Sequence, residues 1–168
     1  MRKLILIITI VLSLSLAACN IEFSAIINPS LDTVEVGSSW TDPGCTTTGT
    51  QCIKTNGEVD IETIGEYHIE YTAQNSKGET LKLLRVVHVI DAISPVLHLN
   101  PGIDSVKVGT QYIDTGCFGL DNYDENISCE VDTSSVDSSI IGEYLVVYHA
   151  VDSSGNEATI TRIVVVYE

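Results

Sequence analysis

Residues 64–73 read Ile-Gly-Glu-Tyr-His-Ile-Glu-Tyr-Thr-Ala, and this stretch decides the fold because it occurs twice. Residues 141–150 repeat the frame Ile-Gly-Glu-Tyr-x-x-x-Tyr-x-Ala. Side chains alternate between the two faces of a β-strand, so Tyr67, Ile69 and Tyr71 share one face, and the residues between them point towards water. The pattern therefore predicts one half-buried strand in each copy.

A turn follows each of these strands. Residues 75–78 read Asn-Ser-Lys-Gly, and residues 152–155 read Asp-Ser-Ser-Gly. Each turn ends in the glycine that a longer hairpin loop uses for a left-handed backbone position. Each copy thus has the central hairpin of a small β-sandwich.

Other short runs rich in β-forming residues alternate with turn signals, and outside the N-terminal leader no stretch has sustained helical periodicity. The fold class we expect is all-β, with two tandem immunoglobulin-like sandwiches. In the first unit we expect strands near 22–28, 32–36, 58–62, 66–74 and 80–90. In the second unit we expect them near 95–100, 104–108, 128–132, 135–139, 143–151 and 157–167.

The two copies also agree upstream of the repeated strand, where residues 34–45 match residues 106–117. The second copy is longer only between its two cysteines, a difference that a closed surface loop would tolerate. Each unit has about 70 residues, a size at which the core alone gives marginal stability. The connection at 89–95 contains no Gly-Ser run, so we expect a stiff hinge.

Four cysteines follow the leader, and they permit three disulfide connectivities. We favour pairing within each repeat, Cys45 with Cys52 and Cys117 with Cys129, because each copy must close its own loop. By the chain-entropy model, loops this short stabilise by about 2–3 kcal/mol each. A metal knuckle is a weaker interpretation, since the spacings do not form Cys-x-x-Cys and no histidine lies nearby.

The N-terminus has the pattern of an export signal: a basic start with Arg2 and Lys3, an apolar run, and then Leu-Ala-Ala before Cys19. This ending resembles the lipobox of bacterial lipoproteins, in which the cysteine is lipidated. The resemblance implies a surface protein anchored by lipid at the outer face of the cytoplasmic membrane. The expected division is a signal peptide at 1–18, lipidated Cys19 with a tether at 19–23, and Ig-like domains at 24–91 and 92–168.

The formal net charge is −15, and it becomes more negative once the leader is removed. Nucleic-acid phosphates require a basic surface, so we expect no nucleic-acid partner. An acidic surface favours cations and basic partners, but we favour the simpler interpretation of a solvated acidic surface.

The ordered set of motifs resembles the bacterial surface protein Ig-like domain, and it is similar to hyalin-type repeats and to the Ig-like module of certain pesticidal crystal proteins. The motifs are Val-x-Val-Gly, then Tyr/Trp-x-Asp-x-Gly, Ile-Gly-Glu-Tyr-x-x-x-Tyr, and Arg-x-Val-x-Val. The resemblance covers nearly all of residues 24–168. It implies an extracellular stalk, spacer or adhesive unit without catalysis. The paired cysteines depart from the usual family pattern.

No nucleophile or zinc-protease motif is present in the sequence, so we expect no enzyme. We expect the four histidines on separate strands, either on the surface or with their ring nitrogens hydrogen-bonded within the fold: His68, His88, His98 and His149.

The tyrosines of the repeated strands are expected in the core. The tyrosine after Gly-Glu in each copy, Tyr67 or Tyr144, is expected to form a tyrosine corner. A carbohydrate-binding lipoprotein is an alternative, with Trp40, Tyr112 and Tyr123 as the candidate aromatics.

The second cysteine loop carries an acidic cluster: Asp121, Asn122, Tyr123, Asp124, Glu125 and Asn126. Loops on a rigid scaffold often carry function, so this loop is the candidate recognition element. Oxygen ligands at alternating spacing suit calcium, and the candidate ligands are Asp91, Asp114, Asp121 and Asp124. A solvated acidic loop is the competing interpretation, because no EF-hand pattern is present.

From the sequence we therefore expect a lipid-anchored, non-enzymatic surface protein that works as an Ig-like binding, adhesion or spacer module. Its partners would be the membrane, through the lipid, and an unidentified protein or glycan. The alternatives are the carbohydrate-binding lipoprotein and a calcium-dependent adhesive module. No cofactor other than calcium is expected.

Overall fold

The computed structural model describes residues 22–168, and all the regular secondary structure in this range is β-strand. The leader and Cys19 lie outside the described residues. Within the described part, no helix is long and apolar enough to cross a membrane. The all-β prediction is confirmed.

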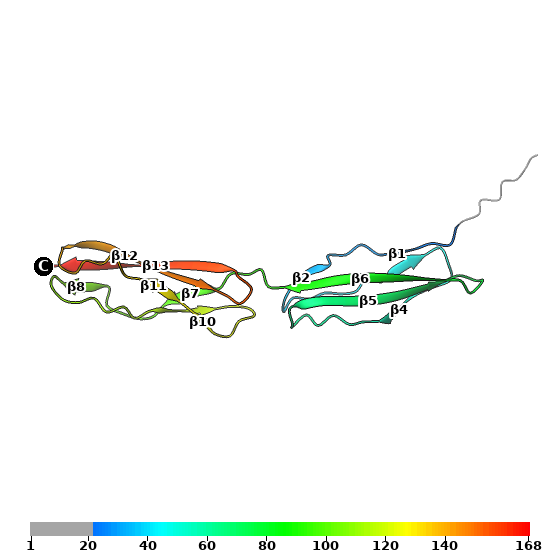
Figure 1. Cartoon of the computed structure of the whole chain (residues 1–168), viewed down its shortest axis with the longest axis horizontal. Helices are drawn as coiled ribbons and strands as arrows, with labels where there is room; N and C mark the ends of the chain where they lie inside the picture. Colours follow the sequence, from blue (N-terminus) through cyan, green and yellow to red (C-terminus); the bar gives the residue numbers. More distant parts are fainter. Residues whose placement is uncertain (1–21) are drawn as a thin grey trace, which may run out of the picture.

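The first domain has two sheets (Figure 1). Its strands are β1 (Ala25–Ile27), β2 (Thr33–Glu35), β3 (Cys45–Thr47), β4 (Gln51–Asn56), β5 (Gly65–Gln74) and β6 (Thr80–Ile90). The larger sheet has the order β2-β6-β5-β4, in which β2 runs parallel to β6 and the other pairs are antiparallel. The strands β1 and β3 pair in the smaller sheet.

The second domain repeats this arrangement. Its strands are β7 (Val96–Leu99), β8 (Ser105–Lys107), β9 (Cys117–Leu120), β10 (Ile127–Ser128), β11 (Glu130–Asp132), β12 (Gly142–Val151) and β13 (Glu157–Tyr167). The larger sheet has the order β11-β12-β13-β8, again with one parallel pair, β13 with β8. The order of the other sheet is β10-β9-β7.

The core of each sandwich lies on the inner face of its long central hairpin, as the alternation predicted. In β5, Ile69, Tyr71 and Ala73 are at most 1% exposed, and the intervening His68 and Glu70 face solvent. The matching residues of β12 are equally buried. The pattern repeats because both hairpins place every second side chain between two sheets.

The tyrosine after Gly-Glu forms a corner in both domains, as the sequence predicted. The Tyr67 hydroxyl donates to the Thr63 carbonyl at 2.8 Å, and the Tyr144 hydroxyl donates to the Ile140 carbonyl at 2.9 Å. Each bond fastens the start of the central strand to the loop before it.

The hairpin turns also have the predicted geometry. Gly78 has φ of 83° and Gly155 has φ of 93°, in the left-handed region that a side chain would disfavour. In both domains this glycine allows the chain to reverse between the two longest strands.

Two predicted strands are wrong, and three strands were missed. Residues 58–62 and 135–139 form loops and turns in which Asp60 and Asp137 bind nearby backbone N–H groups. An aspartate that caps a turn in this way competes with strand pairing, even in the first segment, where Val59 and Ile61 alternate with acidic residues. The missed strands β3, β4 and β9 are rich in threonine, cysteine or glycine, so they lack a clear apolar period.

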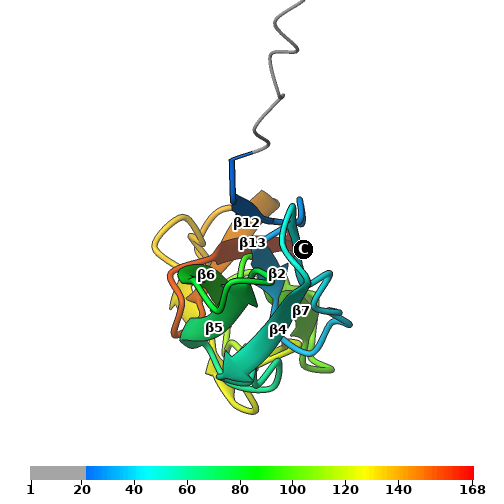
Figure 2. The ribbon, with the colours of Figure 1, turned by 90° about the vertical axis from the view of Figure 1, so that its right-hand side faces the viewer.

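The two domains lie end to end. Figure 1 shows the first domain on the right and the second on the left, joined by a single short connection. Viewed along the long axis, the domains overlap almost completely (Figure 2). The described chain begins at the far end of the first domain, and the C-terminus lies at the opposite end of the molecule (Figure 1).

Candidate functional site at the domain junction

Hydrogen bonds to residues of the first and second domains fix the position of the connection between them. The strand β6 ends at Ile90 and β7 begins at Val96. The Ala92 N–H donates to the Glu35 carboxylate at 3.1 Å, and the same carboxylate accepts a bond from Asn122 Nδ2 at 3.0 Å. Glu35 belongs to β2 and Asn122 to the second domain, so this carboxylate joins the two domains.

The β9–β10 loop is fastened to its own domain through Asp124, while Asn122, Tyr123 and Glu125 remain exposed. Asp121 Oδ1 accepts hydrogen bonds from the N–H groups of Tyr123 and Asp124, at 2.9 and 3.1 Å. Asp124 Oδ2 in turn accepts bonds from both the N–H and the hydroxyl of Ser153, each at 2.8 Å. The loop that the sequence singled out is thereby fixed on the β12–β13 turn.

That turn is built around Asp152, which is 7% exposed. Its Oδ1 accepts bonds from the N–H groups of Ser154 and Asn156, and its Oδ2 accepts one from Asn156 Nδ2 at 2.8 Å. Burial alone would raise the pKa of Asp152. The hydrogen bonds from Asn156 and Ser154 outweigh this effect and hold the pKa below its usual value, so the carboxylate is charged at neutral pH.

Three carboxylates from these segments converge at the junction. One oxygen each of Asp91, Asp124 and Asp152 lies within 4.8 Å of the others, an arrangement that could hold a metal ion. Asp91 comes from the connection, Asp124 from the β9–β10 loop and Asp152 from the β12–β13 turn; Figure 1 shows all three segments at the end of the second domain that faces the first. The junction is therefore the candidate functional site.

The four calcium candidates from the sequence are only partly brought together. Asp91 and Asp124 meet, whereas Asp121 lies outside the group, although its buried Oδ2 has no donor among residues 22–168. Asp114 lies apart from this group, in a hydrogen-bond network with two tyrosines. Sequence reasoning missed Asp152 as a member of this group, because its position in the Asp-Ser-Ser-Gly turn already explained it.

Asp114 belongs to a structural network inside the second domain. Its carboxylate accepts bonds from the hydroxyls of Tyr148 and Tyr112 at 2.5 and 2.9 Å and from the Gly116 N–H at 2.7 Å. Burial acts to raise the pKa of Asp114, but these bonds and the charge of Arg162 lower it below its usual value. Asp114 lies outside the carboxylate group of the junction, and the nearby Arg162 already supplies a positive charge, so Asp114 stabilises the fold of the second domain.

Both disulfides are present, and each lies within one repeat, as predicted. Cys45 pairs with Cys52, and Cys117 pairs with Cys129. Each bridge starts on the smaller sheet, at β3 or β9, and ends on or beside the outer strand of the larger sheet, β4 or β11. The bridges therefore tie the two layers of each sandwich together.

The aromatic candidates for sugar binding do not form one platform. Trp40 and Tyr112 occupy equivalent positions in the two separate domains, and each donates a hydrogen bond within its own domain. Tyr123, at the junction, is 38% exposed.

His68 and His88 lie on the neighbouring strands β5 and β6, and their rings lie 2.8 and 3.8 Å from the Glu66 carboxylate. The other two histidines lie in the second domain. His98 stacks on Phe118 with ring centroids 5.2 Å apart, and His149 lies 3.4 Å from Glu157. Among residues 22–168, the clustered carboxylates of the junction form a metal-compatible group that includes no histidine.

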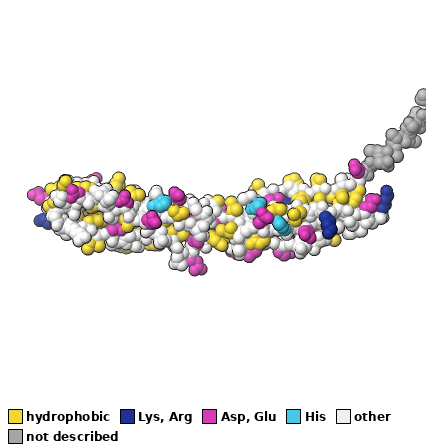
Figure 3. All heavy atoms as spheres, in the orientation of Figure 1, with side chains coloured by type: hydrophobic (Ala, Val, Ile, Leu, Met, Phe, Trp, Pro, Cys, Tyr) yellow, Lys and Arg dark blue, Asp and Glu magenta, His cyan; other side chains and the backbone are white. Residues whose placement is uncertain are grey.

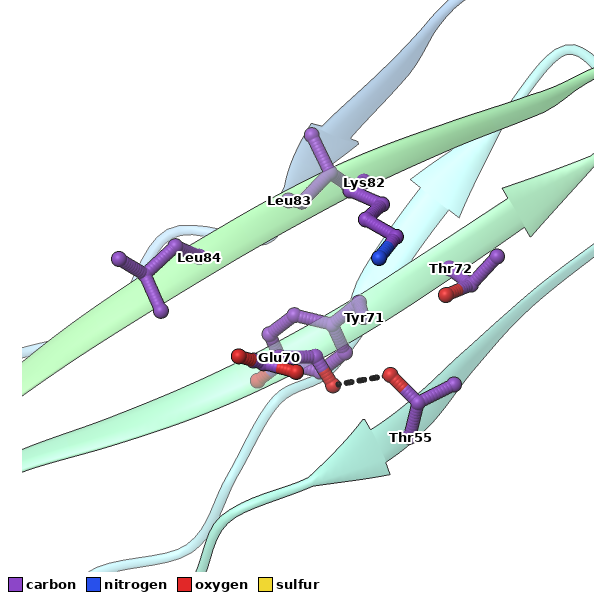
Figure 4. Close-up of a pocket in the computed structure, with 7 residues that line it drawn as sticks. All are labelled: Thr55, Glu70, Tyr71, Thr72, Lys82, Leu83 and Leu84. Carbon is purple, nitrogen blue, oxygen red and sulfur yellow. Dashed lines mark hydrogen bonds between the residues drawn. The ribbon is translucent and has the colours of Figure 1, made fainter.

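A shallow groove of about 390 Å³ lies on the outer face of the first domain. Figure 4 shows the side chains that line it, including Glu70, Lys82 and Leu84, on neighbouring strands. Thr55 donates to the Glu70 backbone carbonyl at 3.2 Å, which holds β4 against β5. The residues of this groove form no catalytic constellation.

Acidic side chains are spread over both domains on the face drawn in Figure 3. They do not gather into one acidic surface there. The converging carboxylates of the junction are therefore distinguished by their close approach and burial, since acidic charge is general to the molecule.

A family model for the bacterial surface protein Ig-like domain matches residues 29–89 and again residues 104–166. Together the two matches cover more than half of the chain, and each falls on one sandwich. The chain belongs to this family, and it carries two tandem copies of the domain.

A curated relative, an uncharacterized 81.3 kDa protein of Acholeplasma phage L2, is 32% identical over 123 residues. The match covers 68% of this chain but only 16% of the relative, so the chain spans a small part of that protein. Among solved structures, the lipoprotein BT2262 from Bacteroides thetaiotaomicron aligns over 86% of this chain and 80% of its own, with 14% identity and a TM-score of 0.36.

Proposed function

We propose that this protein is a lipid-anchored, non-enzymatic surface module whose two Ig-like domains form a rod that holds its far end away from the membrane. The observation that carries the proposal is the end-to-end arrangement of the domains (Figure 1). A rod fits a spacer or display role because its length separates the anchored end from the exposed end.

The position of the expected anchor supports this interpretation. Cys19 lies three residues before Glu22, where the described chain begins. The described chain begins at the outer end of the first domain (Figure 1). A diacylglyceryl group on Cys19 would supply two acyl chains, which is sufficient for stable membrane attachment. The second domain would then be the one farther from the bilayer.

The family supports a surface location, and the chemistry of the described residues supports a role without catalysis. The polar side chains buried inside each sandwich, Arg85 and Arg162, are engaged in hydrogen bonds that hold the layers together. The groove beside Lys82 lacks a nucleophile paired with a base. Presenting or spacing a surface is the function that such a scaffold performs best.

The test uses the full chain with a C-terminal epitope, produced in a bacterial host that processes lipoproteins. With Cys19 intact, we expect the epitope in the membrane fraction and accessible to antibody on intact cells or on spheroplasts. Cys19→Ala removes the acceptor for the lipid, so the epitope should leave the membrane fraction or remain in an unprocessed form.

Ser24→Ala is the matched control, because it changes a small residue just after the tether and should leave processing unchanged. Retention of the Cys19→Ala protein in processed, membrane-bound form would contradict the lipid anchor. An epitope that antibody reaches only after lysis of spheroplasts would contradict the surface role.

A further inference from the structure

The carboxylates of the junction lack a compensating positive charge. None of Asp91, Asp124 and Asp152 forms an ion pair with a lysine or arginine in the part of the chain that the structure describes. Like charges at this separation repel, most strongly where side chains are withdrawn from water. Two of the three, Asp91 and Asp152, are at least nine-tenths buried.

A second observation, independent of the clustering, is that the buried carboxylate of Asp91 has few hydrogen-bond partners. It is 8% exposed, and its Oδ2 is buried without any hydrogen-bond donor among residues 22–168. Its Oδ1 accepts only a long bond from the Ile93 N–H at 3.3 Å. Buried oxygens in proteins almost always have a partner, so this oxygen requires one that residues 22–168 do not supply, and a cation shared with the neighbouring carboxylates would be such a partner.

The ligand atoms are those that calcium prefers. All three are carboxylate oxygens, which suit hard cations, and no cysteine or histidine takes part. Calcium binds oxygens at about 2.3–2.6 Å, so two ligands of one ion lie at most about 5 Å apart. The three oxygens lie within 4.8 Å of one another and meet this limit.

The first repeat shows that the fold does not need these charges. At the position of Asp152 the first domain has Asn75, whose Oδ1 accepts bonds from the N–H groups of Lys77 and Glu79 at 2.9 and 3.0 Å. An uncharged side chain therefore builds the same turn. Asp124 lies in the longer second cysteine loop, while the first loop, residues 46–51, has no acidic residue.

We propose that Asp91, Asp124 and Asp152 bind one calcium ion that fastens the connection between the domains to the second domain. Asp91 follows the last strand of the first domain, whereas Asp124 and Asp152 belong to the second. An ion held by all three fixes the direction in which the chain enters the second domain. This inference stands independently of the lipid anchor.

The test is a titration of the full chain, purified in a mild detergent, with Tb³⁺ as a luminescent substitute for calcium. Tyr123 is adjacent to Asp124 and can transfer excitation to a bound Tb³⁺. We expect one saturable site per chain from which Ca²⁺ displaces Tb³⁺ and Mg²⁺ does so at least tenfold less effectively. Isothermal titration with Ca²⁺ alone measures the same site directly.

Asp152→Asn and Asp124→Asn should each weaken Ca²⁺ binding at least tenfold. Glu125→Gln is the matched control: it removes one charge from the same loop but is exposed and outside the group, so binding should change less than twofold. The asparagine at position 152 reproduces Asn75, so we expect the variant to fold, with an unchanged circular dichroism spectrum. If Asp152→Asn does not fold, the comparison of Asp124→Asn with Glu125→Gln tests the same site.

Chelation gives a second readout. EDTA should lower the unfolding temperature of the parent protein, because calcium binds only the folded junction, and it should have little effect on Asp152→Asn. The proposal is overturned if millimolar Ca²⁺ does not bind, if Mg²⁺ displaces Tb³⁺ as well as Ca²⁺ does, or if Glu125→Gln weakens binding as much as Asp152→Asn.

Discussion

At the scale of single residues, a buried arginine is the polar centre of each domain. Arg85 is 1% exposed and donates hydrogen bonds to the Tyr71 hydroxyl at 3.2 Å, to Asp32 at 2.7 Å and to the Asn28 carbonyl at 2.6 Å. Arg162 makes the equivalent contacts with Tyr148, Asp104 and Asn100. A guanidinium satisfies several acceptors at once, so one residue joins a central strand to the loops of the other layer.

Replacing this arginine tests its role. Arg85→Met keeps an apolar stem but leaves the Asn28 carbonyl and the Tyr71 hydroxyl without their donor. We expect the free energy of unfolding of the first domain to fall by about 2–4 kcal/mol, the usual cost of breaking a buried polar network. Urea unfolding followed by fluorescence of Trp40, the single tryptophan of the chain, measures this domain.

Lys82→Met is the control for that variant. Lys82 lies three residues earlier on the same strand and is exposed, so its loss should change the free energy of unfolding by about 0.5 kcal/mol or less. Equal effects of the two variants would show that the network around Arg85 does not stabilise the domain.

At the scale of elements, the disulfides compensate for the small size of one layer. The smaller sheet of the first domain consists of only β1 and β3, and β3 is three residues long. Two short strands hold each other weakly, so a covalent link from β3 to β4 keeps the layer in place. The second domain uses the same link from β9.

Removing the first bridge should destabilise its own domain. The double variant Cys45→Ala, Cys52→Ala should lower the free energy of unfolding by about 2–3 kcal/mol, since the open loop gives the unfolded chain more freedom. The Trp40 transition in urea should move to a lower midpoint.

The matched control is Cys117→Ala with Cys129→Ala, which opens the bridge of the other domain. Since Trp40 reports on the first domain, its midpoint should move much less. If both double variants shifted the Trp40 midpoint equally, the domains would unfold as one unit, and the local role of the bridges would be refuted.

At the scale of the whole molecule, the short connection and the contacts beside it keep the rod extended. Glu35 and Asn156 contribute hydrogen bonds on either side of Asp91 and Ala92. A connection of this length, without glycine, gives little freedom for the domains to bend against each other.

Lengthening the connection should allow the two domains to bend against each other. We expect insertion of Gly-Ser-Gly-Ser between Ile93 and Ser94 to leave both domains folded but to broaden the distribution of molecular lengths and reduce the mean. Small-angle X-ray scattering of the full chain in detergent, with the detergent contribution matched out, measures the change.

The same insertion after Ser76, in the β5–β6 turn, is the control because it lengthens an exposed loop at the far end of the first domain. It should leave the length distribution almost unchanged. An equal effect of both insertions, or no effect of the first, would show that the connection does not set the shape.

The sequence by itself determined the features that depend on neighbours along the chain. Alternation in residues 64–73 and 141–150 predicted which side chains are buried, and the glycine of each turn predicted the hairpins. The repeat predicted two domains and the pairing of cysteines within each. These features are local, because the period of a strand and the conformation of a turn are set by a few consecutive residues.

Only the tertiary structure decided which distant residues meet. Asp91, Asp124 and Asp152 are far apart in the chain and come together only when a loop and a turn of one domain pack at the end of the other. Asp114, like Asp91, was a further candidate by sequence, but its position in the fold gives it tyrosine hydroxyls as partners. Residue type shows what a side chain can bind, whereas packing decides what lies within its reach.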